Sequence, residues 1–257
     1  MSRFADTLRD SIRIFAANPK FIVPKLIISI LYSITLVFTA ELAVDALAEP
    51  AIGALFPLLA LLAAVLAISF LDIIAGAMYP FMVADVKSGR RVSLGSAFGS
   101  VMGNAGKILP PVILVEASIL AVIFIISVPL SLLIVSESDY TLVFTAIYLA
   151  IVVAVVFLFY SLYPVLAFEK VKFMDSFRRS IGISMGNRRE VGKATIVSVA
   201  LSSISFLLAF AIEFLPQSEG TLLFWAAFVI IRFLTAYVYA YLYVLSPVFY
   251  LAYGGKK

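Results

Sequence analysis

Residues 51–83 form one apolar run, AIGALFPLLALLAAVLAISFLDIIAGAMYPFMV, in which Asp72 is the only charged residue. An α-helix needs about 20 mostly apolar residues to cross a bilayer, so this run predicts a transmembrane helix. Similar runs recur along the chain. The six predicted spans are Phe21 to Val44, Ala51 to Val83, Ile108 to Val135, Leu142 to Phe168, Val191 to Phe214 and Leu222 to Tyr250.

The composition predicts the same class, an all-α polytopic membrane protein. The chain has 257 residues, of which 63% are hydrophobic and 13% charged, whereas soluble domains are nearer half apolar and a quarter charged. The sequence has no cysteine and no histidine. It therefore cannot form disulfides or iron–sulfur clusters, and it lacks the usual acid–base group at neutral pH. We expect neither a cofactor nor a metal.

The distribution of charge predicts the orientation. Of the 19 Lys and Arg residues, all except Arg232 lie near the N-terminus, near the loops after the second and fourth spans, or in the C-terminal tail. The opposite loops contain only acidic charges, at Glu41, Asp45, Glu49, Glu137, Asp139, Glu213 and Glu219. The positive-inside rule then predicts a cytoplasmic membrane protein with both termini in the cytoplasm. Residues 1–20 lack a continuous apolar core, so we expect no cleavable signal peptide.

Two markers indicate three tandem copies of one unit. A short amphipathic segment ends in asparagine before each odd-numbered span, and each even-numbered span has a proline near its basic end. The markers are Asn18, Asn104 and Asn187, and Pro80, Pro164 and Pro247. We expect a single membrane domain, 1–257, with repeats at about 2–84, 92–168 and 173–253, each an amphipathic helix followed by a two-helix hairpin.

The amphipathic segments are expected to lie in the membrane interface. In the first, Phe4, Leu8, Ile12 and Phe15 form one apolar helix face. Ser93 and Asp175 are predicted N-caps of the second and third segments, and the asparagines suit a turn because asparagine tolerates left-handed backbone and bonds nearby backbone. Two interpretations remain open: a structural collar around the helices, or a regulatory, ligand-gating element.

Among the charged residues of the predicted spans, three stand out because they lie far from the span ends: Asp72, Glu116 and Arg232. A charge at the bilayer centre costs at least about 2.5 kcal/mol, so each needs a partner or a purpose. In one hypothesis, Arg232 ties its helix to Glu116 or Asp72. In the other, the two carboxylates share a layer that binds a proton or a cation. Lys25 and Lys107 lie at the inner edge, and we expect them to extend toward the headgroups.

The last span contains four alternating tyrosines, Tyr237, Tyr239, Tyr241 and Tyr243. Alternation distributes them over more than one helix face, and several lie too deep for an interfacial aromatic belt. Their hydroxyls need acceptors. The tyrosines therefore either form packing hydrogen bonds or line a substrate surface.

The run from Ser11 to Pro24, with Asn18-Pro19-Lys20 after an amphipathic helix, resembles the start of a group of six-helix membrane proteins. This group includes the membrane domain attached to some glycerophosphodiester phosphodiesterases. The resemblance implies an integral membrane module rather than an activity. The chain contains no phosphodiesterase domain and no histidine for such an active site, so no catalytic residue follows from it.

These observations favour a non-enzymatic membrane module of prokaryotic origin, acting as a scaffold, a membrane organiser or a partner-binding protein. Its expected partners are the bilayer, anionic headgroups at the cytoplasmic face, and a membrane-protein partner or a second copy of the chain, but no nucleic acid. The alternative is a small transporter or channel for an anionic or proton-coupled solute. An intramembrane lipid enzyme is a third reading, in which Asp72 and Glu116 are the candidate acid–base groups.

Overall fold

The described part of the protein is almost entirely helical, with short loops such as residues 88–93 and 169–172 between helices. The computed structural model describes residues 3–48, 55–133, 137–211 and 222–254, and contains no strand in these ranges. The helices are α1 (Arg3–Ala16), η1 (Pro19–Phe21), α2 (Ile22–Ala48), α3 (Leu55–Lys87), α4 (Leu94–Gly103), α5 (Ala105–Leu133), α6 (Glu137–Phe159), α7 (Leu162–Phe168), α8 (Phe173–Gly186), α9 (Arg188–Ala211) and α10 (Leu222–Tyr253).

Several helices are long and apolar enough to cross a membrane. Within the described residues there are four such spans, Leu59–Lys87, Ala105–Leu130, Val143–Phe168 and Ala226–Tyr253. A fifth is counted if α1 and the segment Pro19–Thr35, which meet at 93°, form one broken span. The predicted run Val191 to Phe214 is not among them. The helix that contains it, α9, begins with the charged sequence RREVGK and its run extends beyond the described residues.

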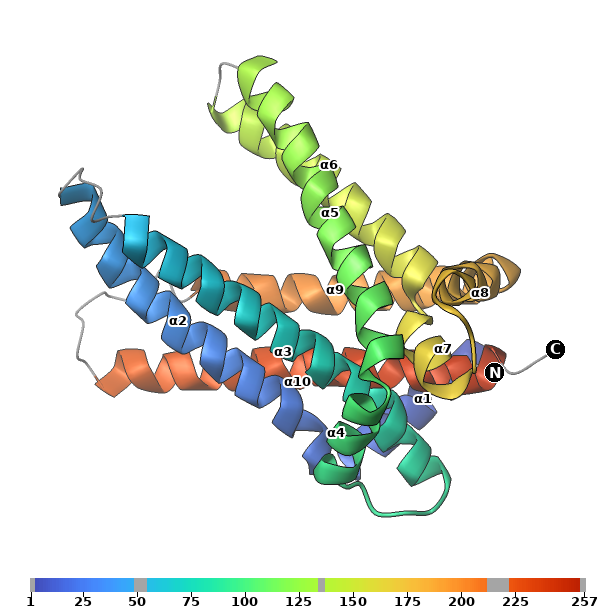
Figure 1. The fold of residues 1–257 in the computed structure, drawn as a ribbon. Helices are drawn as coiled ribbons and strands as arrows, with labels where there is room; N and C mark the ends of the chain where they lie inside the picture. The colour runs from blue at the N-terminus through green and yellow to red at the C-terminus, as the bar shows by residue number, and fades with distance from the viewer. Residues whose placement is uncertain (1–2, 49–54, 134–136, 212–221, 255–257) are drawn as a thin grey trace.

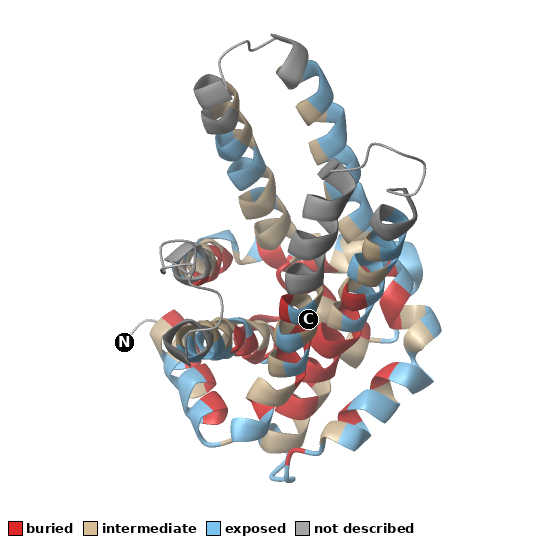
Figure 2. Ribbon diagram, turned by 90° about the vertical axis from the view of Figure 1, so that its left-hand side faces the viewer, coloured by how far each residue is buried: buried red, intermediate tan, exposed pale blue. Residues whose placement is uncertain are grey.

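The long helices meet at one end of the molecule. The α2/α3 and α5/α6 pairs spread apart from a common base, where α4, α7 and α8 lie (Figure 1). Helix α10 is central, because it packs against α1, α2, α3, α7 and α9. Buried residues gather at the base (Figure 2). The largest fully buried side chains there are Phe21, Tyr79, Met82, Val101, Ile108, Leu166, Val244, Leu245 and Phe249.

The three asparagines occupy equivalent turns. Each side-chain Nδ2 donates to the backbone carbonyl four residues earlier: Asn18 to Ile14 at 2.8 Å, Asn104 to Ser100 at 2.9 Å and Asn187 to Ile183 at 3.0 Å. The bond adds a side-chain donor to a carbonyl in the last turn of the preceding helix, and the Ile183 carbonyl also accepts the backbone N–H of Asn187 at 3.0 Å. The predicted turn is therefore present, but it does not use left-handed backbone, since no described residue other than glycine has a positive φ.

The three prolines have different surroundings. Pro80 and Pro247 lie inside α3 and α10, whereas Pro164 lies in α7, after a break that separates α7 from α6. Because Pro164 has no N–H, it cannot bond the carbonyl of Tyr160 four residues earlier. Ser246 Oγ donates to that carbonyl at 2.6 Å. A hydroxyl from α10 thus compensates for the bond that Pro164 removes.

The short amphipathic helices use their faces differently. In α1, Phe4 and Phe15 are buried within the protein, and Ile12 is the one exposed residue of the predicted stripe, at 51%. In α8 the buried face consists of three serines and Ile183, and the exposed face carries large apolar side chains. The exposed apolar residues of α8 are Phe173, Met174 and Met185, and its buried serines are Ser176, Ser180 and Ser184.

One predicted N-cap is confirmed and one is wrong. Ser93 caps α4, and its Oγ accepts from the backbone N–H of Ser96 at 3.3 Å. Helix α8 begins two residues before Asp175, with Lys172 at the N-cap position. Asp175 lies instead in the first turn, where a carboxylate stabilises the positive end of the helix dipole.

Candidate intramembrane polar site

An ion pair joins α2 to α3 at the base of the molecule. Lys25 Nζ lies 2.5 Å from Asp72 Oδ1, and also lies 3.9 Å from the ring centroid of Tyr243 on α10. Lys25 is only 6% exposed, so the prediction that it extends toward the headgroups is wrong. The reason is the sharp bend before α2, which brings Lys25 against α3 and α10. A buried lysine held this way exchanges water for a carboxylate and an aromatic face.

Gly76 allows Tyr243 to lie this close to α3. Gly76 is one helical turn beyond Asp72, and a Cβ built on it would lie 2.6 Å from Cε1 of Tyr243 and 3.1 Å from the hydroxyl of Tyr163. A larger residue would therefore displace one of these rings. Tyr79 completes the packing, with its ring 5.3 Å from that of Tyr243 and its hydroxyl donating to the carbonyl of Phe21 at 2.8 Å.

A cavity of about 530 Å³ adjoins the ion pair, and we call it the Arg232 cavity. Residues of α2, α3, α9 and α10 line it. Its polar lining includes Lys25, Ser29, Asp72, Ser205, Arg232 and Thr235. Three buried atoms in this lining have no hydrogen-bond partner within the described structure: Nε of Arg232, Oγ1 of Thr235 and Oγ of Ser205.

Arg232 does not form the expected tie. Among the described residues it makes no ion pair with Asp72 or Glu116, and the partner of Asp72 is Lys25 instead. The guanidinium Cζ lies 5.2 Å from the ring centroid of Phe228, one turn earlier on α10. Its backbone carbonyl accepts a hydrogen bond from Ser29 Oγ at 3.3 Å, which joins α2 to α10. Arg232 therefore faces the cavity as a positive charge without a carboxylate partner in the described structure.

Glu116 lies in a second cavity of about 340 Å³, which we call the Glu116 cavity. Its lining is mostly apolar, with Ser198 and Ser202 of α9 among the polar residues. Tyr239 and Tyr243 line both cavities. The two carboxylates that we expected in one layer thus belong to neighbouring cavities that meet at two tyrosines.

The four alternating tyrosines of α10 divide between two faces. Tyr237 packs edge-on against Phe15 of α1 with ring centroids 4.8 Å apart, and the hydroxyl of Tyr241 lies 3.2 Å from Ser11 Oγ. Tyr239 and Tyr243, on the other face, line the cavities. Tyr237 and Tyr241 therefore pack against α1, Tyr239 and Tyr243 line the cavities, and a substrate-lining role stays a prediction.

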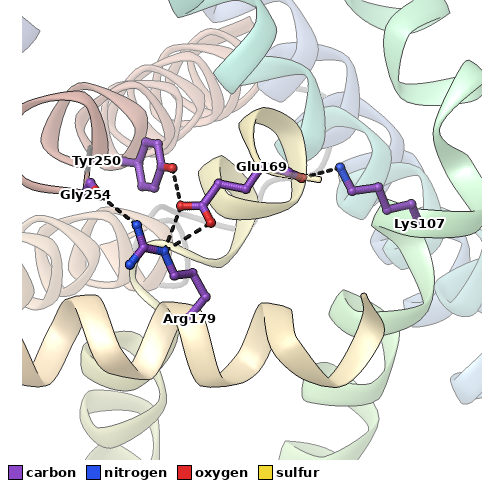
Figure 3. Close-up of polar contacts among 5 residues, drawn as sticks. All are labelled: Lys107, Glu169, Arg179, Tyr250 and Gly254. Carbon is purple, nitrogen blue, oxygen red and sulfur yellow. Dashed lines mark hydrogen bonds and ion pairs between the residues drawn. The ribbon is translucent and has the colours of Figure 1, made fainter. Parts of the chain in front are cut away.

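A second polar cluster lies at the end of α7, and of its residues only Lys107 was singled out from the sequence (Figure 3). Glu169 Oε1 accepts from Arg179 Nε at 2.8 Å and from the hydroxyl of Tyr250 at 2.6 Å. Arg179 also donates to the carbonyl of Gly254 at 3.0 Å, and Lys107 Nζ donates to the Glu169 carbonyl at 2.6 Å. We call these five residues the Glu169 cluster.

The Glu169 cluster joins α5, α7, α8 and α10. The hydrogen bond from Arg179 to Glu169 is the main cause that raises the pKa of Arg179 above its ordinary value, so the guanidinium stays charged. Lys107 does not extend freely toward headgroups, because its ammonium holds the end of α7. Sequence spacing gave no signal for this cluster, since Glu169 and its partners come from separate helices.

The comparisons with known proteins provide no relative. No family model matches the chain, and neither the curated proteins nor the solved structures gave a match. The described residues contain no group of three or more Asp and Glu side chains that could hold a metal ion. The site must therefore be interpreted from its own geometry.

Proposed function

We propose that this is a six-span protein of a prokaryotic cytoplasmic membrane, built from three tandem units with both termini in the cytoplasm. Two features support it: a short helix followed by two long helices occurs three times in the element order, and Asn18, Asn104 and Asn187 make the same hydrogen bond. Reporter fusions after Lys87 and after Lys257 should both be cytoplasmic, and a fusion at Gly53 should be external. An external reporter after Lys87 would contradict the model.

We propose further that the protein is a small, non-enzymatic transporter or channel for a polar solute. One observation carries this proposal: the Arg232 cavity and the Glu116 cavity adjoin at Tyr239 and Tyr243, and their linings include α3 and α10, which are long and apolar enough to span a membrane. Ionisable residues such as Arg232 and Glu116 are costly inside a membrane bundle, and where they face a cavity they mark solute pathways. A catalytic role is disfavoured because Asp72 is held by Lys25, and no described hydroxyl or amine is hydrogen-bonded to Glu116 as a nucleophile.

The natural absence of cysteine makes a direct test possible. Single cysteines are placed at Thr235 in the Arg232 cavity and at Ser202 in the Glu116 cavity. The matched controls are Val229 and Ile196, which lie on the same two helices and are 63% and 70% exposed on the outer surface. In proteoliposomes, a membrane-impermeant thiosulfonate should label the cavity positions and leave the controls unmodified. If neither cavity position is labelled, the proposed solute pathway is contradicted.

A membrane-organising scaffold is the second candidate, favoured by the exposed apolar faces of α4 and α8. Phe98 and Met102 of α4 are 48% and 37% exposed, and Met174 and Met185 of α8 are 59% and 53% exposed. Such faces insert into the headgroup boundary. Vesicles reconstituted with the protein should then become smaller in electron micrographs, and Met174→Ser/Met185→Ser should abolish the change. Unchanged vesicle diameters with the natural protein would reject this role.

The resemblance to the membrane domain of glycerophosphodiester phosphodiesterases stays a prediction. It is compatible with a membrane module that lacks an active site of its own. Under this proposal, anionic headgroups and a second membrane protein or a second copy of the chain are the partners, and no nucleic acid, cofactor or metal is needed.

A further inference from the structure

The Arg232 cavity has the features of an anion site. We propose that it binds the phosphate group of an organic phosphate, held by the Arg232 guanidinium and the hydroxyls of Ser205 and Thr235. This inference deepens the proposed function, on which it rests, by naming the class of solute. The argument has three steps: the charge of the cavity, its unused hydrogen-bonding atoms, and its size.

The charged lining of the cavity has an excess of one positive charge. Three charged residues line it, Lys25, Asp72 and Arg232. Lys25 and Asp72 compensate each other at 2.5 Å. Arg232 has no carboxylate within ion-pair distance among the described residues, and its buried Nε has no hydrogen-bond partner in the described structure. A guanidinium in a low-dielectric environment requires an anion nearby, and a bound ligand can provide one.

The unused polar atoms are of the kind that an oxyanion requires. Nε of Arg232, Oγ1 of Thr235 and Oγ of Ser205 are buried and without partners in the described structure. Arg232 and Thr235 lie one turn apart on α10, and Ser205 lies on α9, so donors approach the cavity from two helices. Guanidinium and hydroxyl groups together match the several oxygens of a phosphate, which accepts bonds from a planar Arg fork.

The size of the cavity favours a phosphate that carries an organic group. About 530 Å³ is much more than a single phosphate needs, and the lining also includes Ile28, Ala236 and Tyr32. These residues provide apolar and aromatic surface beside the charged end. Water alone would satisfy the hydroxyls but would leave the charge of Arg232 without an anion. The organic phosphate comes from one of two sources, a lipid headgroup or a soluble ester.

The test uses the full chain purified in detergent and isothermal titration calorimetry with three probes. The probes are dihexanoyl phosphatidic acid, glycerol 3-phosphate, and dihexanoylglycerol, which has the same acyl chains without phosphate. Saturable binding of phosphatidic acid alone assigns a lipid phosphate. Binding of glycerol 3-phosphate assigns a soluble ester. Binding of dihexanoylglycerol as tightly as phosphatidic acid, or of neither phosphate probe, overturns the inference.

Variants assign the binding to this cavity. Arg232→Gln should weaken phosphate binding by about tenfold or more, because a charge-assisted bond is lost, and Ser205→Ala/Thr235→Val by about threefold. Arg178→Gln removes an exposed arginine outside the cavity and should change affinity less than about twofold. Equal affinity in Arg232→Gln and the natural protein would overturn the proposal. If Arg232→Gln fails to fold, the Ser205→Ala/Thr235→Val variant replaces it in the titration. Unchanged phosphate affinity in that variant would then overturn the proposal.

Thiol labelling and phosphate binding together test the phosphate site and the solute pathway separately. Thiol labelling at Thr235 and Ser202 reports whether the cavities admit solute at all. Labelling of both positions without phosphate binding would reject the anion and leave the transporter standing. Phosphate binding lost in Arg232→Gln, without labelling at either position, would support the site and reject the pathway.

Discussion

The Glu169 cluster and the Arg232 cavity contain similar groups, but the groups are used differently. In the Glu169 cluster, one carboxylate accepts from Arg179 and Tyr250, and Nη2 of Arg179 and the ammonium of Lys107 each donate to a backbone carbonyl. In the Arg232 cavity, an arginine and two hydroxyls have buried atoms without partners in the described structure. Satisfied networks stabilise a fold, whereas unsatisfied ones suggest a ligand.

The Lys25–Asp72 pair shares a feature with each region. Like the Glu169 cluster, its two charges have partners, but both residues line the Arg232 cavity. Asp72→Asn should destabilise the protein most, by about 3 kcal/mol, since it leaves the Lys25 ammonium buried without a counter-charge. Unfolding in mixed micelles with increasing SDS measures the change. Lys25→Met/Asp72→Asn removes both charges and should recover most of the loss. A double variant no more stable than Asp72→Asn would show that the pair does more than neutralise charge.

Substitutions in the Glu169 cluster should cause the second-largest loss of stability. Glu169→Ala removes the acceptor of Arg179 and Tyr250 and should cost about 2 kcal/mol in the same unfolding measurement, allowing for the partial exposure of the two charged side chains. Glu190→Ala is the control, because Glu190 pairs with Lys193 on a single helix, and it should cost less than about 0.5 kcal/mol. Equal losses would mean that the cluster is an ordinary surface pair.

A single neutral hydrogen bond gives a smaller effect. Ser246→Ala removes the donor to the Tyr160 carbonyl, which Pro164 leaves open, and should cost about 1 kcal/mol. Ser127→Ala, which removes a bond within α5 to the Phe124 carbonyl, should cost much less because the carbonyl can keep its helical partner. A Ser246→Ala protein as stable as the natural one would show that the α6–α7 break needs no compensation.

Local patterns anticipated more of the fold than of the site. The apolar run of residues 51–83 predicts α3, and the asparagine turns follow from local bonding. Asp72, Glu116 and Arg232 were identified as costly because burial of charge can be inferred from the sequence. The partner of Asp72 was not, because it depends on the 93° bend before α2. Contacts between residues far apart in the sequence, such as Tyr250 with Glu169, leave no periodic signal in the sequence.

Substitutions of the unpartnered hydroxyls in the Arg232 cavity should have the smallest effect on stability. Thr235→Val replaces a hydroxyl that has no partner in the described structure by a methyl group of similar size. Because removing an unsatisfied buried polar atom relieves a desolvation cost, we expect unchanged or slightly increased stability, by up to about 1 kcal/mol. SDS unfolding of Thr235→Val and Ser205→Ala beside Ser246→Ala measures the contrast. A loss as large as that of Ser246→Ala would mean that the hydroxyl already has a partner, and the Arg232 cavity would then resemble the Glu169 cluster: a structural network rather than a binding site.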